Sequence, residues 1–303
     1  MLVWSVMVSV SVLVVMAKKW MSIIKLWSFP ISAIPVTVGT ALSTDFNLLL
    51  YLLMVVGIIS LTFAANVLND FFDFRHGFDR PSHTNSTKRV NPLILKAITE
   101  RQMLVISAAF IILAALCGVY IALIRGPLVI LAGVVGVFAV VFYTAGKRSI
   151  KSLGFGELLI FAIYGPAITA SSFFVESGTF SYVALAASIP VGIVIAIILL
   201  ANNIRDISAD SDAGLRTMAV RLGAQRSRIL FRSLIVLSYA SVIIFSLFRI
   251  LPFYSIITVA SIPYAILIIN KITVPRNVPQ TSPQISLRFA LVFGILLVTG
   301  ILL

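Results

Sequence analysis

The chain has 303 residues, of which 60% are hydrophobic and only 11% charged, and it carries a formal net charge of +13. A soluble protein needs a largely polar exterior, so this composition excludes a soluble enzyme, a secreted scaffold and a disordered tail. It indicates a membrane protein, and the positive charge is then typical of basic loops rather than of nucleic-acid binding. The single cysteine, Cys117, excludes an intramolecular disulfide.

Nine apolar segments of about the length of a membrane span follow one another along the chain. We therefore expect an all-α, polytopic bundle of nine transmembrane helices that forms one domain over residues 1–303. The apolar N-terminus is short, and residues 1–21 predict an interfacial helix at the membrane surface. The predicted spans cover residues 23–43, 46–68, 102–124, 127–145, 154–175, 180–201, 229–248, 252–270 and 285–303.

The basic residues fall on one side of this predicted topology. Of the 23 lysine and arginine residues, all but Arg125 and Arg249 fall on the side of the N-terminus, in the connections or in the ends of the spans next to them. Positively charged connections stay in the cytoplasm, so we expect a cell-membrane protein with a cytoplasmic N-terminus. The two long connections, 69–101 and 202–228, lie on that side, and loops of this length usually carry function.

Six of the ten acidic residues form two clusters, one at the start of each of these connections, and most of the cluster residues are spaced to share one face of a helix. Stacked carboxylates repel each other and are costly near a bilayer, which predicts a cation between them. Carboxylate and amide oxygens suit Mg²⁺, which commonly completes its coordination with substrate phosphates. Arg75 and Arg205 lie among the acids and are candidates to hold phosphate oxygens. The clusters are Asn66, Asn69, Asp70, Asp73 and Asp79, and Asn203, Asp206, Asp210 and Asp212.

Two other interpretations remain open at this stage. In the first, the connections are solvated loops whose acids only pair with neighbouring lysine and arginine. The occurrence of two clusters at matched positions makes this interpretation less favoured. In the second, from a different functional class, the chain is a non-enzymatic, cation-coupled membrane carrier. Against the carrier, the predicted spans hold almost no ionisable groups, because the acids lie at the membrane edge.

The two clusters resemble the paired Asp-rich motifs of the UbiA superfamily of intramembrane prenyltransferases. The first reads N-D-F-F-D-F-R-H-G-F-D from Asn69 to Asp79, and the second reads N-N-I-R-D-I-S-A-D from Asn202 to Asp210. The six-residue step from Asp73 to Asp79 is similar to the 1,4-dihydroxy-2-naphthoate prenyltransferases and the animal UbiA-domain enzyme of vitamin K metabolism. Further similar segments cover residues 27–39, 143–147 and 153–157.

This resemblance implies a cavity open to the membrane and capped on the cytoplasmic side by the two Asp-rich loops. It also implies two Mg²⁺ ions that bridge the loops to the diphosphate of an isoprenyl donor. Lys25 replaces the arginine that is commoner in the family, so we assign it no role. The implied metal ligands are Asn69, Asp70, Asp73, Asp79, Asn203, Asp206 and Asp210, the implied diphosphate contacts are Lys147, Arg205 and Arg75, and the implied catalytic residues are Asp73, Asp206, Tyr143 and Lys147.

The expected function is Mg²⁺-dependent transfer of an isoprenyl group to a lipophilic aromatic acceptor, 1,4-dihydroxy-2-naphthoate in menaquinone synthesis. Metal ions and cationic side chains stabilise a leaving diphosphate, and an aromatic ring such as Tyr143 stabilises an allylic cation. The alternative for Tyr143 and Lys147 is a pair of interfacial anchors. No obligate protein partner is indicated.

Two other acceptors are alternatives within the superfamily, namely 4-hydroxybenzoate and a geranylgeranylglyceryl phosphate. The branches that use them usually carry an Asp-x-x-Asp-x-x-x-Asp first motif followed by N-R-P-x-R-P. This chain has Gly77 at the position of the third acid of that motif, and it lacks the second R-P.

Overall fold

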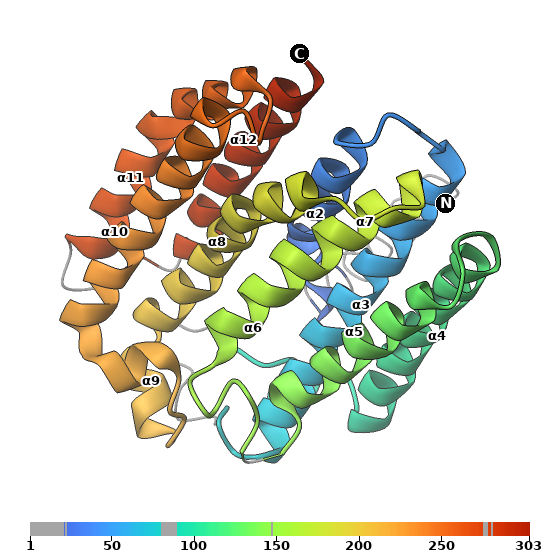
Figure 1. Cartoon of the computed structure of the whole chain (residues 1–303). Helices are drawn as coiled ribbons and strands as arrows, with labels where there is room; N and C mark the ends of the chain where they lie inside the picture. The colour runs from blue at the N-terminus through green and yellow to red at the C-terminus, as the bar shows by residue number, and fades with distance from the viewer. Residues whose placement is uncertain (1–20, 22, 80–89, 147, 275–277, 280) are drawn as a thin grey trace, which may run out of the picture.

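The computed structural model describes the chain except for residues 1–20, 22, 80–89, 147, 275–277 and 280 (Figure 1). The described residues contain helices and no strand, which confirms the all-α prediction. The predicted site residue Lys147 lies outside the described residues. So does the predicted interfacial helix over 1–21, apart from residue 21. The elements are η1 (Leu26–Ser28), α2 (Phe29–Ala41), α3 (Leu48–Arg75), α4 (Glu100–Arg125), α5 (Leu128–Thr144), α6 (Gly156–Ala162), η3 (Ile163–Ala167), α7 (Ile168–Ser177), α8 (Tyr182–Arg205), α9 (Ile207–Asp212), α10 (Met218–Leu247), η4 (Phe253–Ser261), α11 (Ile262–Thr273) and α12 (Ser282–Leu302).

Seven helical segments of the described chain are long and apolar enough to cross a membrane, by length and composition. Five are the single helices α3, α4, α8, α10 and α12, and two are composite, Gly156–Ser177 and Phe253–Thr273. Helices α2 and α5 coincide with the other two predicted spans but have only 13 and 17 residues. The polytopic bundle is therefore confirmed, whereas a count of nine spans stays a prediction.

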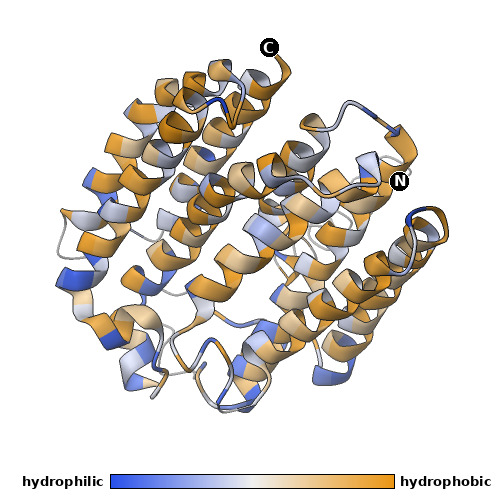
Figure 2. Ribbon diagram, in the orientation of Figure 1, coloured by the Kyte–Doolittle hydropathy of each residue, from blue (hydrophilic) through white to orange (hydrophobic). Residues whose placement is uncertain are grey.

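Large apolar side chains cover the outer surface of the bundle. On α4 and α5, for example, Leu116, Leu123, Leu131 and Phe138 are all more than half exposed. Figure 2 shows hydrophobic residues along the helices and hydrophilic residues gathered at the end of the bundle that holds α9. Exposed apolar surface of this extent suits lipid and not water.

Helix α8 is the most buried of the long helices and packs against α10, α12, α6 and the π-helical turn η3. It comes close to the end of α6 and to η3, where a Cβ atom added to Gly165 would lie 2.8 Å from the backbone oxygen of Ser188. A Cβ on Gly192 would meet the backbone oxygen of Phe161 at 2.7 Å. Glycine at both positions lets the two backbones approach, as small residues commonly do between membrane helices.

The predicted cap connections are partly helical in the residues that are described. Helix α3 continues through the first acidic motif to Arg75, and the second connection contains the end of α8, all of α9 and the first turns of α10. Helix α10 is kinked at Gly223, whose φ is +75°. Both acidic motifs therefore stand on helices that extend beyond the apolar part of the bundle, at the same end of the molecule (Figure 1).

We predict that this end faces the cytoplasm, because nearly all basic residues sort to it. Ser211 in α9 and Asp45 between α2 and α3 are exposed at opposite ends, and the free thiol of Cys117 is buried. In a Cys117→Ser background, Ser211→Cys should react with an impermeant maleimide only from the cytoplasmic side, and Asp45→Cys only from outside. The reverse pattern in intact and permeabilised cells would contradict the orientation.

Candidate active site

A cavity of about 870 Å³ lies between α3, α4, α5, the α6–α7 segment and α8, and it contains both acidic motifs at one end. The walls away from that end are mostly apolar and include several small residues, such as Ala114, Gly118, Gly133 and Gly136. The cavity continues to Val175, in the last turns of α7. The arrangement joins a charged end to a long apolar compartment.

The first motif presents one face of α3 to the cavity. Asn66, Asn69, Asp70 and Asp73 all line it, as the helical spacing predicts. The helix ends in a Schellman motif, in which Phe78 N donates to Asp73 O at 2.9 Å and Gly77 N donates to Phe74 O at 3.1 Å. This turn needs a left-handed residue, which is Gly77 with a φ of +72°. The chain then folds back, and Asp79 also lines the cavity.

The second motif ends in the same way. Leu215 N donates to Asp210 O at 2.8 Å, Gly214 N donates to Ser211 O at 3.0 Å, and Gly214 has a φ of +76°. The two helices α8 and α9 meet at Asp206, whose φ and ψ are −98° and 9°. Asn203, Asp206 and Asp210 are buried and line the cavity, so the predicted face survives the break between the helices.

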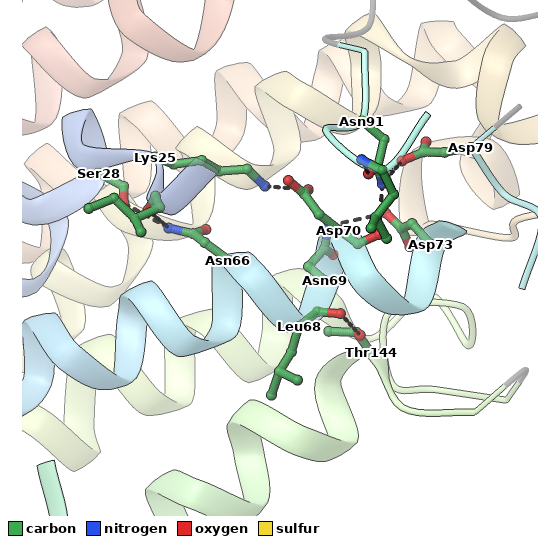
Figure 3. Close-up of polar contacts among 12 residues, drawn as sticks. Lys25, Ser28, Asn66, Leu68, Asn69, Asp70, Asp73, Asp79, Asn91 and Thr144 are labelled. Carbon is green, nitrogen blue, oxygen red and sulfur yellow. Dashed lines mark hydrogen bonds and ion pairs between the residues drawn. The ribbon is translucent and has the colours of Figure 1, made fainter. Parts of the chain in front are cut away.

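Three cationic side chains in the cavity wall pair with carboxylates of the motifs. Lys25 Nζ lies 2.9 Å from Asp70 Oδ1, a contact visible in Figure 3. Lys151 Nζ lies 2.7 Å from Asp73 Oδ2. Arg205 binds Asp206 through two hydrogen bonds, Nε to Oδ1 at 2.8 Å and Nη2 to Oδ2 at 2.6 Å. Each of these carboxylates therefore has a counter-charge supplied by the chain itself.

Amide side chains fix the rest of the first motif. Asn91 Nδ2 donates to Asp79 Oδ2 at 2.9 Å and to the backbone oxygen of Asp70 at 2.7 Å, which ties the returning chain to the helix (Figure 3). Asn66 Nδ2 donates to Ser28 Oγ at 2.9 Å. This bond lies between α3 and the segment that carries Lys25, and it holds Lys25 close to Asp70.

Most of the predicted site residues are brought together, and two of the described ones are not. Tyr143 and Arg205 line the cavity with the acids already named, whereas Asp212 is exposed and does not line it. Arg75, which we expected to contact a diphosphate, is also absent from the cavity wall. Its guanidinium lies over the ring of Phe71 and 3.5 Å from Glu100. Residues two apart lie on different sides of a helix, so Arg75 points away from the face that bears Asp73.

Sequence reasoning assigned no role to four residues that the structure places at the site. Lys25, Lys151 and Asn91 contact the first motif as described, and Glu157 contacts the second, accepting a hydrogen bond from Asn203 Nδ2 at 2.8 Å. Two of them carried a signal in the sequence. Lys25 stands where the resemblance implies a basic residue before the first span, and Glu157 is an acid between apolar segments in L-G-F-G-E. The contacts of Lys25, Asn91 and Lys151 join residues 12 to 78 positions apart in the chain, at distances that helical spacing does not predict.

The oxygen donors fit Mg²⁺ only as part of a larger complex. Within the described residues, no group of three or more His, Cys, Asp or Glu side chains is close enough to hold a metal ion alone. Five carboxylates and three cations of the described chain line the cavity, so these residues together contribute two net negative formal charges. An anionic diphosphate would be repelled without added cations, and Mg²⁺ commonly uses one or two carboxylates together with substrate phosphates. The oxygen donors of the two motifs are therefore compatible with Mg²⁺ that is shared with a diphosphate.

Comparison with known proteins agrees with this arrangement. The model of the UbiA prenyltransferase family matches residues 32–283. A 1,4-dihydroxy-2-naphthoate octaprenyltransferase of Mycobacterium tuberculosis is 29% identical over 254 residues, 82% of this chain and 84% of its own length. The human UbiA prenyltransferase domain-containing protein 1 is 28% identical over 290 residues, 89% of this chain and 81% of its own length.

Solved structures share the fold. A UbiA homologue of Aeropyrum pernix, in its apo form, has a TM-score of 0.68 at 18% identity and covers 89% of this chain and 96% of its own. A UbiA homologue of Archaeoglobus fulgidus, bound to DMAPP and Mg²⁺, has a TM-score of 0.61 at 18% identity and covers 93% of this chain and 99% of its own. Likeness at this level of identity shows the fold alone.

The buried pair between Lys151 and Asp73 gives a test of the site that needs no substrate. Removing one partner of a buried ion pair leaves an uncompensated charge, at a cost of roughly 3 kcal/mol. Lys151→Met should therefore lower the thermal unfolding midpoint in detergent, and the double variant Lys151→Met/Asp73→Asn should recover most of the loss. The control is Arg75→Met, since the Arg75–Glu100 pair is 60% and 45% exposed and should contribute about 0.5 kcal/mol or less. A Lys151→Met variant as stable as the control would contradict the pairing.

Proposed function

Because this chain belongs to the UbiA prenyltransferase family and is a prenyltransferase, we propose that it transfers a prenyl group from a prenyl diphosphate to 1,4-dihydroxy-2-naphthoate. The observation that carries the proposal is the meeting of two acidic motifs in one cavity with a long apolar wall. The charged end suits the diphosphate, and the apolar compartment suits the prenyl chain. The non-enzymatic carrier has no support from the relatives, which are enzymes by name.

The charged end of the cavity is the proposed binding site of the donor diphosphate. A cavity with two net negative charges needs divalent cations to accept it, and we propose two Mg²⁺ ions, one for each motif. When bound, Mg²⁺ neutralises part of the charge that develops on the leaving diphosphate. The Archaeoglobus homologue bound to DMAPP and Mg²⁺ supports this choice of ion. The residues that would hold the metal are Asn69, Asp70, Asp73, Asp79, Asn203, Asp206 and Asp210.

We also propose that three cations of the chain contact the diphosphate directly. Lys25, Lys151 and Arg205 line the cavity beside the acids, and each is bonded to a carboxylate that would also serve the metal. Cationic side chains that surround a leaving group stabilise its developing charge without reorganisation of solvent. Lys147 lies outside the described residues, and its predicted contact with the diphosphate stays a prediction.

The apolar wall keeps water away from the reacting carbon. Breaking the allylic C–O bond leaves a cation that water would capture, so the compartment has to be dry. Tyr143 lines the cavity at the end of α5, next to the charged end, where its ring is placed to stabilise the cation. Lys151 N donates to the backbone oxygen of Tyr143 at 3.1 Å, so the tyrosine and a diphosphate-binding lysine are joined through the backbone.

The acceptor is the finer part of the proposal, and the relatives support it. In the proposed step, the ring carbon of 1,4-dihydroxy-2-naphthoate that bears the carboxylate forms a C–C bond with the prenyl group. The diphosphate leaves with the electrons of the C–O bond. The bond between ring and carboxylate then breaks, its electrons return to the ring, and CO₂ is released. No oxidant is needed for this balance.

Removing an acid from either motif should abolish most of the activity. We expect Asp73→Ala and Asp206→Ala each to reduce turnover at least about 10²-fold, as for the loss of charge stabilisation at a leaving group. Asp212→Ala is the matched control, because Asp212 is exposed and outside the cavity, and it should keep near-normal turnover. EDTA should stop the reaction, and added Mg²⁺ should restore it. Near-normal turnover in either cavity variant, or activity that survives EDTA, would refute the paired-acid mechanism.

The acceptor is tested by competition. Purified protein with Mg²⁺ and one prenyl diphosphate is given equal concentrations of 1,4-dihydroxy-2-naphthoate, 4-hydroxybenzoate and a geranylgeranylglyceryl phosphate, and the products are measured by mass spectrometry. We expect the naphthoate to be prenylated with the highest kcat/KM and with release of CO₂. A higher kcat/KM for the benzoate or the lipid phosphate would overturn the acceptor and leave the family and the metal proposal intact.

A further inference from the structure

A buried glutamate stands directly behind the second acidic motif, and the proposed chemistry gives it no role. Glu157 lies in the first turn of α6, is only 4% exposed and is not part of the cavity wall. The preceding residue, Gly156, lies close to two other helices. A Cβ there would lie 3.4 Å from both Leu199 of α8 and Tyr143 of α5. The start of α6 thus packs tightly between the two helices that carry site residues.

The contact of Glu157 fixes the orientation of an amide in the cavity wall. Asn203 Nδ2 donates to Glu157 Oε1 at 2.8 Å, and Asn203 itself lines the cavity. An ionised carboxylate only accepts hydrogen bonds, so it selects the amide nitrogen of Asn203. The amide oxygen, Oδ1, is then on the side away from Glu157. An asparagine held in this way offers an oxygen ligand and cannot rotate to offer its NH₂ group.

An asparagine of the first motif is held in the same way, with its amide nitrogen and its amide oxygen bound to different partners. Asn69 Nδ2 donates to Asp73 Oδ2 at 3.1 Å, while Asn69 Oδ1 accepts from the ammonium group of Lys151 at 3.1 Å. In both motifs a carboxylate accepts a hydrogen bond from the amide nitrogen of an asparagine. In the first motif the amide oxygen also faces a cation. In the second motif the carboxylate comes from another helix, 46 residues earlier in the chain.

The two oxygens of Glu157 differ in their contacts. Oε2 is buried and has no hydrogen-bond partner among the described residues. Oε1 accepts the hydrogen bond from Asn203, so Glu157 acts on the second motif through this one oxygen.

We propose that Glu157 is a positioning residue of the second motif, which holds the Asn203 amide so that its oxygen faces the metal–diphosphate site. The proposal rests on the proposed function, because it requires Mg²⁺ and a diphosphate in the cavity. Residues that orient a metal ligand from behind commonly change metal affinity by about 10- to 100-fold when they are removed. Glu157 should therefore set the Mg²⁺ requirement more than the maximal rate.

The first measurement follows binding without turnover. The unfolding midpoint of the full chain in detergent is recorded against Mg²⁺ concentration, at a fixed concentration of an unreactive thio-analogue of a prenyl diphosphate. Ligand that binds only the folded chain raises this midpoint. For Glu157→Ala we expect the Mg²⁺ concentration at half-maximal stabilisation to rise at least about tenfold. Glu157→Gln should stay within about threefold of wild type, because its amide oxygen still accepts from Asn203. The same shifts should appear in the Mg²⁺ dependence of turnover.

Glu176 provides a matched control in the same composite helix. It is 1% exposed, its Oε2 accepts from Asn47 N at 2.8 Å, and its Oε1 has no hydrogen-bond partner among the described residues. It lies at the opposite end of the segment Gly156–Ser177, away from the acidic motifs. Glu176→Ala removes the same chemistry, so it should change stability without changing the Mg²⁺ requirement.

A reversed pair of side chains tests the hydrogen bond itself. In Asn203→Asp, two carboxylates face each other at the start of α6, and we expect weakened Mg²⁺-dependent stabilisation. In the double variant Asn203→Asp/Glu157→Gln, the new glutamine amide donates to the new carboxylate, and at least half of the loss should be recovered. This pair keeps the test open even if Glu157→Ala does not fold.

Each contrary result has a distinct meaning. A Glu157→Ala variant with the wild-type Mg²⁺ requirement, an equal shift in Glu176→Ala, or no recovery in the double variant would overturn the positioning role. A Glu157→Gln variant that binds Mg²⁺ normally but loses turnover would also overturn it, since it would make the carboxylate a proton acceptor. In all these cases a Mg²⁺-dependent wild type leaves the proposed function standing. A wild type that Mg²⁺ neither stabilises nor activates would instead refute the proposed function.

Discussion

A charged group at the edge of a bilayer needs a partner inside the protein, because lipid offers none and a low-dielectric interior makes an unpaired charge costly. The cavity gathers five carboxylates under this constraint, and its architecture follows from it. Lys25, Lys151 and Arg205 come from three different parts of the chain to neutralise three of them. The connection after α5 folds back to bring Lys151 there, and Asn66 holds the segment that brings Lys25. Among the described residues the carboxylates outnumber these cations, and this surplus is the basis for proposing that divalent metal enters together with the diphosphate.

The parts of the fold that depend on local pattern could be predicted from the sequence. The apolar segments predicted the positions of all the long helices that the structure describes, because a run of about 20 apolar residues is typical of a transmembrane helix. The helical faces of both acidic motifs were predictable from spacing, and so were their ends, because Gly77 and Gly214 each supply the left-handed residue of a Schellman motif. The boundaries were less accurate. Helix α10 begins at Met218, well before the predicted span at 229, because its first turns are amphipathic and lie outside the apolar segment.

The parts of the site that depend on tertiary packing were not predictable in this way. Lys151 and Glu157 reach the motifs because α5 and α6 place the intervening connection against α3 and α8, and no spacing rule carries that information. Arg75 shows a different limit. It is two residues from Asp73, but two residues along a helix correspond to about 200° of rotation, and Arg75 does not line the cavity. Helical geometry alone, applied to this residue, places it on the opposite face.

The π-helical turn η3 sets the rotation of α7 relative to α6, and both helices contribute to one wall of the cavity. The wall positions of the α6–α7 segment recur at four-residue steps, as in Ile160, Tyr164, Ile168 and Ser172. A regular α-helix would rotate such a series by about 40° at every step, and it would soon face another helix. The wider turn at Ile163–Ala167 absorbs part of this rotation. The extra residue in this turn thus offsets the rotation of the helix. A single row of side chains therefore lines the cavity from the charged end to the far end of the compartment. Insertions and deletions in this turn would change the alignment of the two halves while leaving the residues of each half unchanged.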